Sequence, residues 1–99
     1  MHARVTHTKG PADSVDQATK VIREQVIPTA SQIPGYKGIV TFANRETGEG
    51  WSATLWESAD AMAASDEAAD AMRGQAIGDI PGSEVVDVTR WEVTIDERA

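Results

Sequence analysis

Few side chains in this 99-residue chain are of the types that usually carry catalysis. There is no cysteine, so a thiolate nucleophile and a thiolate metal site are both excluded. His2 and His7 lie five residues apart in a segment that alternates as a strand, which places them on opposite faces. They cannot form a metal-binding pair, and we expect no metal site. Imidazole titrates near neutral pH, so His7 is the best candidate for a general base. The alternative is an exposed histidine at a strand end.

Charge excludes further classes of function. The net charge is −7, and an acidic chain repels phosphate backbones, which argues against nucleic-acid binding. Residues 57–70 hold five acids and no base. This run is either a surface for cationic partners or the solvated face of a helix. No apolar run approaches the length of a membrane span and no leader-like segment is evident, so we expect a cytoplasmic protein without membrane contact.

The periodicity of the chain predicts the elements that must position these residues. Alternation over 2–8 indicates a strand in which Ala3, Val5 and His7 share one face, and we expect His7 on the side of the sheet that the helices cover. Ser14 and Gln17 have the spacing of a capping box, and an apolar stripe runs from Val15 to Ile33, which predicts a helix. Pro28 inside this stripe should bend the helix without ending it.

The second half has the same kind of pattern. Residues 36–44 and 50–57 indicate two antiparallel strands joined by a polar hairpin loop. Ser58 caps a second predicted helix, with a plausible break at Ser65, and residues 84–95 indicate the last strand. Ile-Pro-Gly precedes a strand at both 33–35 and 80–82. The chain is therefore expected to be one ferredoxin-like α+β domain over residues 1–99, β-α-β-β-α-β, with an antiparallel four-stranded sheet and both helices on one face.

The strands carry apolar residues on both faces, as Leu55 beside Trp56 illustrates. A sheet with one wet face should not have this pattern. We expect a second copy of the chain to cover the face that carries Trp51 and Leu55. The alternative is a monomer with an unusually apolar open sheet.

Three short motifs carry a family resemblance. Thr54-Leu55-Trp56-Glu57-Ser58, together with Val26-Ile27-Pro28 and Ile33-Pro34-Gly35-Tyr36, resembles the antibiotic biosynthesis monooxygenase family over roughly residues 2–95. The resemblance implies a dimeric α+β barrel in which substrate binds between sheet and helices. It places Trp56 at this pocket, with Ser52 and Thr54 beside it by strand alternation. Trp51 then lies on the dimer side.

The sequence departs from the family at its chemical positions. The cofactor-free quinone-forming members have an Asn and a Tyr where this chain has Ser52 and Met62. The haem-degrading members have an Asn, a Trp and a His where this chain has Ala3, Ser65 and Gln75. Without a histidine on the second helix, iron ligation by that route fails, so we expect no haem and no other cofactor.

The remaining candidate residues have two interpretations each. Trp56 either stacks on a flat substrate or anchors the second helix to the sheet. Met62 and Met72 either form an adaptable pocket wall or belong to the core. The sequence therefore predicts a cofactor-independent monooxygenase, or a close relative, that acts on a hydrophobic aromatic molecule. The alternative is a non-catalytic small-molecule-binding or stress-responsive protein on the same scaffold.

Overall fold

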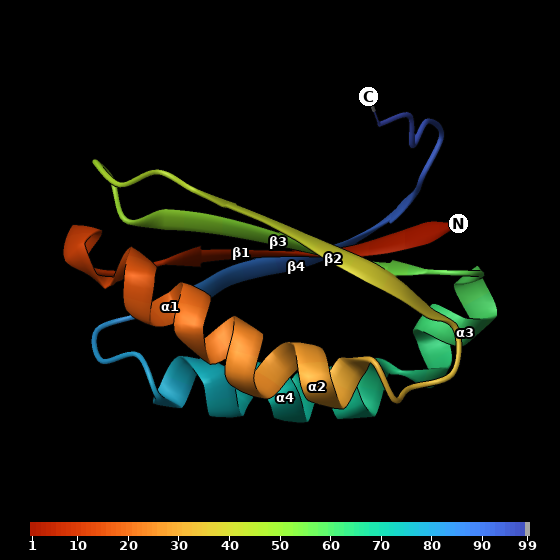
Figure 1. The fold of residues 1–99 in the computed structure, drawn as a ribbon, viewed down its shortest axis with the longest axis horizontal. Helices are drawn as coiled ribbons and strands as arrows, with labels where there is room; N and C mark the ends of the chain where they lie inside the picture. The colour runs from red at the N-terminus through yellow and green to blue at the C-terminus, as the bar shows by residue number, and fades with distance from the viewer. Residues whose placement is uncertain (99) are drawn as a thin grey trace.

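The computed structural model of the chain describes residues 1–98, which form a single β-α-β-β-α-β unit. The four strands pair antiparallel in the order β2-β3-β1-β4. They are β1 His2–Lys9, β2 Tyr36–Ala43, β3 Glu49–Trp56 and β4 Glu84–Glu92. The helical elements are η1 Ala12–Ser14, α1 Val15–Val21, η2 Ile22–Val26, α2 Ile27–Ala30, α3 Ala59–Ala64 and α4 Asp66–Gly78. The longer helices lie together on one side of the sheet (Figure 1), which confirms the predicted ferredoxin-like α+β fold.

The first helical segment widens just before its proline. In the π-helical turn η2, the N–H of Ile27 donates to the carbonyl of Ile22, five residues earlier. Pro28 has no N–H, and its ring crowds the carbonyl four residues before it. One wide turn lets the chain pass the proline and continue to Ala30. The prediction that Pro28 disturbs the helix without ending it is confirmed, although the helix ends before Ile33.

The predicted capping box is wrong. The Ser14 hydroxyl donates backwards to the carbonyl of Pro11, at 2.7 Å, and caps no helical N–H. Gln17 instead donates from its amide to the carbonyl of Asp79, at 2.9 Å. This bond connects the first helical segment to the end of α4. It therefore fixes the two helices relative to each other at one end of the molecule.

The second helical segment breaks where the sequence indicated. Ser58 caps α3, because its hydroxyl accepts a hydrogen bond from the N–H of Ala61 at 3.0 Å. At the break, the buried Ser65 donates its hydroxyl to the carbonyl of Met62, at 2.7 Å. The chain then restarts as α4 at Asp66. This break brings the Met62 carbonyl, Ser65 and Asp66 into contact with Arg4, near the start of β1.

The register of the strands separates the two faces of the sheet. Val40, Phe42, Trp51 and Trp91 all share the face turned away from the helices. Each of these side chains is exposed, from 38% for Trp51 to 59% for Phe42. The expectation of an apolar face away from the helices is therefore confirmed, whereas the face toward the helices carries Arg4, Thr6, Thr41 and Ser52 and is largely polar. Among residues 1–98, no helix has the length and apolar character needed to cross a membrane.

Candidate functional site

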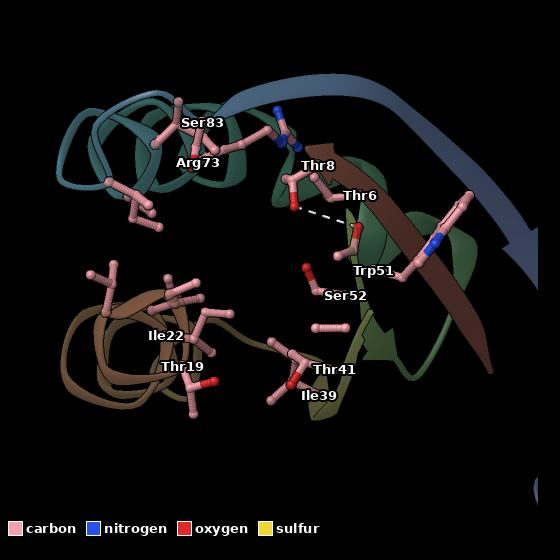
Figure 2. Close-up of a pocket in the computed structure, with 18 of the residues that line it drawn as sticks. Thr6, Thr8, Thr19, Ile22, Ile39, Thr41, Trp51, Ser52, Arg73 and Ser83 are labelled. Carbon is pink, nitrogen blue, oxygen red and sulfur yellow. Dashed lines mark hydrogen bonds between the residues drawn. The ribbon is translucent and has the colours of Figure 1, made fainter. Parts of the chain in front are cut away.

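A cavity of about 330 Å³ lies between the sheet and the helices. Its floor is formed by side chains of β1, β2 and β3, and its walls come from the first helical segment and α4 (Figure 2). The helix walls are mostly apolar and include Val15, Ala18, Ile22, Met72 and Ile77. A volume of a few hundred Å³ with apolar walls and few polar groups is typical of a small-molecule site.

Three hydroxyl groups cross the floor of the cavity in one row. Ser52 of β3 pairs with Thr6 of β1 on one side and with Thr41 of β2 on the other. Cross-strand partners share a face and have Cβ atoms about 5 Å apart. Figure 2 shows all three side chains directed toward the helices. The row offers adjacent donors and acceptors to a flat ligand that lies on the sheet.

Trp56 closes one end of the cavity. Its indole Nε1–H donates to the Thr54 hydroxyl at 3.1 Å, and the Tyr36 ring meets it edge-on at 5.7 Å between centroids. The Arg4 guanidinium carbon lies 5.7 Å from the centre of the indole. Trp56 is only 1% exposed, which leaves almost no ring face for a ligand. These contacts favour the interpretation of Trp56 as an anchor over the interpretation as a stacking platform.

An ion-pair cluster around the buried Arg4 supports this closed end. Arg4 is 3% exposed, and its Nη2 donates to the Met62 carbonyl at 2.8 Å, to the Ser65 hydroxyl at 3.1 Å and to the Asp66 carboxylate. The second oxygen of Asp66 pairs with Arg90 of β4 at 2.9 Å. Hydrogen bonds from Arg90 and Arg4 hold the pKa of the Asp66 carboxyl below its usual value. One carboxylate thus joins α4 to two neighbouring strands.

His7 does not belong to this cavity, and its predicted place on the helix side is wrong. Its ring stacks on Trp51 at 3.8 Å between centroids, with 3° between the planes, and its Nε2 lies 3.0 Å from a Glu49 carboxylate oxygen. His7 pairs with Trp51 across β1 and β3, so both side chains occupy the face away from the helices. The alternation of β1 placed His7 correctly with Ala3 and Val5. The error was to assign that face to the helices.

The other predicted pocket residues divide into two groups. Ser52, Thr54, Trp56 and Met72 all line the cavity and come from β3 and α4. Met62 is buried in the core at 4% exposure and is absent from the lining. Its position in the short helix α3 directs it beside Arg4, before the chain turns into α4. The prediction that Met62 shapes the pocket is therefore wrong, while Met72 is in place to do so.

The sequence patterns did not place Arg4 and Arg73 in the cavity. Arg4 alternates with Thr6 and Thr8 on the floor side of β1, and this pattern could have placed it under the helices. Arg73 of α4 also lines the cavity, although its side chain is charged. Its Nη1 donates to Asp70 at 2.7 Å, while its buried Nε has no hydrogen-bond partner within the described residues. Residues 1–98 contain no cluster of His, Cys, Asp or Glu suited to a metal ion.

Comparison with known sequences gives relatives without established function. No family model matches the chain. Two uncharacterised proteins of Mycobacterium tuberculosis are 26% and 29% identical to it over 98 residues. These matches cover 99% of this chain but only 43% and 41% of the relatives. The chain therefore spans less than half the length of the curated relatives that it matches.

Comparison with solved structures shows the fold. The haem-degrading protein MhuD of Mycobacterium tuberculosis, solved with two haems in its active site, superposes with a TM-score of 0.71 at 20% identity, over 99% of this chain and 100% of its own. A monooxygenase of Streptomyces coelicolor, solved with nanaomycin D, gives 0.64 at 17% identity, over 98% and 92%. A Chloroflexus aurantiacus protein assigned to the antibiotic biosynthesis monooxygenases gives 0.63 at 14% identity, over 99% and 96%. The chain therefore has the α+β ferredoxin-like fold of the antibiotic biosynthesis monooxygenases.

Proposed function

We propose that the chain is a cofactor-independent monooxygenase that acts on a flat, hydrophobic aromatic molecule held in the helix–sheet cavity. The observation that carries this proposal is the cavity itself, about 330 Å³ in volume, with apolar helix walls over a floor of hydroxyl groups. Apolar walls would enclose the ring system, and the hydroxyl row would orient its oxygen substituents. The monooxygenase and haem degrader that share the fold support oxygen chemistry on this scaffold.

The chemistry suits a substrate that supplies its own electrons. An anthrone has a doubly activated CH₂ group that ionises to an electron-rich anion, and this anion can pass an electron to O₂. One oxygen atom becomes the new ketone, and the other leaves as water with the two hydrogens of the CH₂ group. No external reductant is needed. The protein's task is to hold the substrate, favour its ionised form and exclude bulk water.

The residues present do not fit haem. The lining of the cavity, as far as residues 1–98 define it, contains no imidazole, thiolate or phenolate. His7 is committed to the opposite face of the sheet against Trp51. Haem iron in proteins is most often held by His, Cys or Tyr, or by Met together with His. The proposed reaction therefore does not involve haem.

The proposal includes a homodimer formed through the open face of the sheet. Val40, Phe42, Trp51 and Trp91 expose apolar surface on that face, whereas the helices cover the other. At about 25 cal/mol per Å², covering such a surface would contribute several kcal/mol to association. A second copy of the same face is the partner that suits this sheet, because its charged side chains, Glu49 and Asp87 beside His7, lie toward one end of the strands and leave the apolar residues between them free to pack.

A binding protein without catalysis is the second candidate. The observation in its favour is that the charged residues lining the described cavity are three arginines and Glu49, and that the Glu49 carboxylate is engaged by His7. The cavity thus lacks a free base to remove the substrate proton. Ligand-dependent thermal stabilisation without any product would favour this candidate.

Oxygen uptake on a panel of anthrones and hydroquinones tests the proposed function. The protein should accelerate O₂ consumption over buffer for at least one member, and the quinone product should form in equal amount. Heat-denatured protein provides the control for spontaneous oxidation. An O₂ uptake rate equal to that of buffer across the panel would contradict the proposed monooxygenase activity. The non-catalytic binding protein would then be the remaining candidate.

A further inference from the structure

We propose that Arg73 binds an anionic oxygen of the ligand at the end of the cavity opposite Trp56, so that the site selects flat aromatic molecules that carry a carboxylate or a phenolate. This inference rests on the proposed function, because it names the substrate class of the same cavity. Three observations support it: the Arg73 guanidinium lies in the cavity, it is largely buried, and it is only partly paired.

Arg73 is placed inside the cavity without being held there by a full set of partners. Its side chain is 17% exposed and leaves α4 toward Thr8 and Thr6 at the end of β1 (Figure 2). Asp70, its one hydrogen-bond partner among residues 1–98, is 75% exposed, and such exposed pairs contribute little stability. The Nε–H of Arg73 is buried and donates to no described acceptor. Because this nitrogen is covered, a ligand in the cavity would meet the terminal Nη groups of Arg73, of which Nη1 donates to Asp70.

The neighbouring groups complete an anion site. The Thr8 hydroxyl is a weakly engaged donor, at 3.4 Å from the Gly50 carbonyl, and Thr6 adds the hydroxyl of the central row. A guanidinium presents parallel N–H groups that match the two oxygens of a carboxylate. Glu49 also lines this region, but its carboxylate pairs with His7 on the other face. The local charge facing the cavity at this end is therefore positive within a chain whose net charge is −7.

The distance between the two ends sets the shape of the ligand. His2 pairs with Trp56, and Thr8 lies six residues further along β1. At a rise of about 3.3 Å per residue, the Trp56 end and the Thr8 end are separated by roughly 20 Å along the strand. The hydroxyl row of Thr41, Ser52 and Thr6 crosses the space between them. A fused ring system with one acidic substituent at its end would lie within this length with its acid at Arg73.

Arg73 would also favour the ionised form of a phenol or an enol. A fixed positive charge beside the oxygen lowers the pKa of that group. This effect would serve the proposed oxygenation, since the anion is the form that passes an electron to O₂. It would also explain how the cavity works without His7.

Two matched ligands test the assignment, anthracene-2-carboxylate and anthracene-2-carboxamide, with binding followed by fluorescence at neutral pH. The intact protein should bind the carboxylate about 10-fold tighter than the amide, as expected for a charge-assisted pair. Arg73→Met should remove this preference and leave amide binding within about 2-fold. Arg73→Lys keeps the positive charge but loses the planar guanidinium that can bind both carboxylate oxygens. It should therefore retain part of the preference for the carboxylate ligand. Arg23→Met, at an exposed arginine outside the cavity, is the control and should change neither affinity.

The outcomes separate this inference from the proposed function. Equal binding of the two ligands by the intact protein, or an unchanged preference in Arg73→Met, would overturn the role of Arg73 while the aromatic cavity stands. Failure of both ligands to bind would contradict the aromatic site and the proposed function with it. Thermal melting of each variant shows whether an effect on binding is an effect on folding.

Discussion

The indole Nε1–H of Trp56 donates to the hydroxyl of Thr54 at 3.1 Å, so the one polar group of this tryptophan is satisfied by a residue on the same strand. With Arg4 near its ring and Tyr36 at its edge, Trp56 is held as a wall of the cavity. Its function is to define where the cavity ends. In the proposed function, other groups on the floor and on α4 would therefore recognise the ligand.

Trp56 should consequently matter for stability as much as for activity. Trp56→Ala removes a side chain that is 99% buried, and such changes cost about 3–5 kcal/mol of the free energy of unfolding. Trp56→Phe keeps most of the packing and should cost about half as much or less. Urea unfolding followed by circular dichroism measures both. If Trp56→Ala were as stable as the unchanged protein, the anchoring role would be wrong.

The shared carboxylate of Asp66 should make stability depend on acid pH. Hydrogen bonds from Arg90 and Arg4 hold its folded-state pKa below the unfolded value of about 3.9. Its contribution is therefore fully present above about pH 5 and is lost as the pH falls through the folded-state pKa. Asp66→Asn should cost about 1–3 kcal/mol near neutral pH, because it leaves the buried Arg4 without its counter-charge.

The measurement is the free energy of unfolding of the two proteins between about pH 2 and pH 7. The difference between them should shrink as the pH falls below about 4. Asp70→Asn, at an exposed carboxylate of the same helix, is the matched control and should show a much smaller difference. A pH-independent difference for Asp66→Asn would show that the carboxylate charge is not what stabilises the cluster.

The open face of the sheet should control assembly. Phe42→Lys places a charge on a residue of β2 that is 59% exposed, so the fold of the protomer should survive while the apolar interface is lost. Ile95→Lys is the matched control, because Ile95 is 83% exposed and lies beyond β4. Analytical ultracentrifugation should show a dimer for the intact protein and for Ile95→Lys, and a monomer for Phe42→Lys. A monomeric intact protein at tens of micromolar would contradict the proposed homodimer.

The sequence predicted the elements well because their signals are local. Alternation located β1, the hydroxyl of Ser58 located a helix start, and the polar residue Ser65 located the break between α3 and α4. Pro28 was read correctly as a disturbance within a helix. Capping at Ser14 failed because its hydroxyl has a competing acceptor in the carbonyl of Pro11.

The site was predicted only in part. Alternation shows which residues of a strand share a face, but it does not show which of the two faces meets the helices. The spacing of Ser52, Thr54 and Trp56 gave one correct face on β3. On β1 the apolar residues Ala3 and Val5 suggested the helix side, but the helices cover Arg4, Thr6 and Thr8. A buried arginine on this face is acceptable only because Asp66, Ser65 and the Met62 carbonyl converge on it, and single-sequence patterns do not reveal such convergence.

The central claim is that oxygenation takes place in the helix–sheet cavity. Its most direct test follows ¹⁸O₂ during anthrone oxidation by the intact protein and by a variant whose cavity is blocked. Ser52→Phe would fill the middle of the hydroxyl row, while Ser31→Phe places the same group on an exposed helix end outside the cavity. The account predicts one ¹⁸O atom in the quinone and one in water for the intact protein and for Ser31→Phe, and a rate at least about 10-fold lower for folded Ser52→Phe. An unchanged rate in folded Ser52→Phe, or no acceleration over buffer by the intact protein, would contradict it.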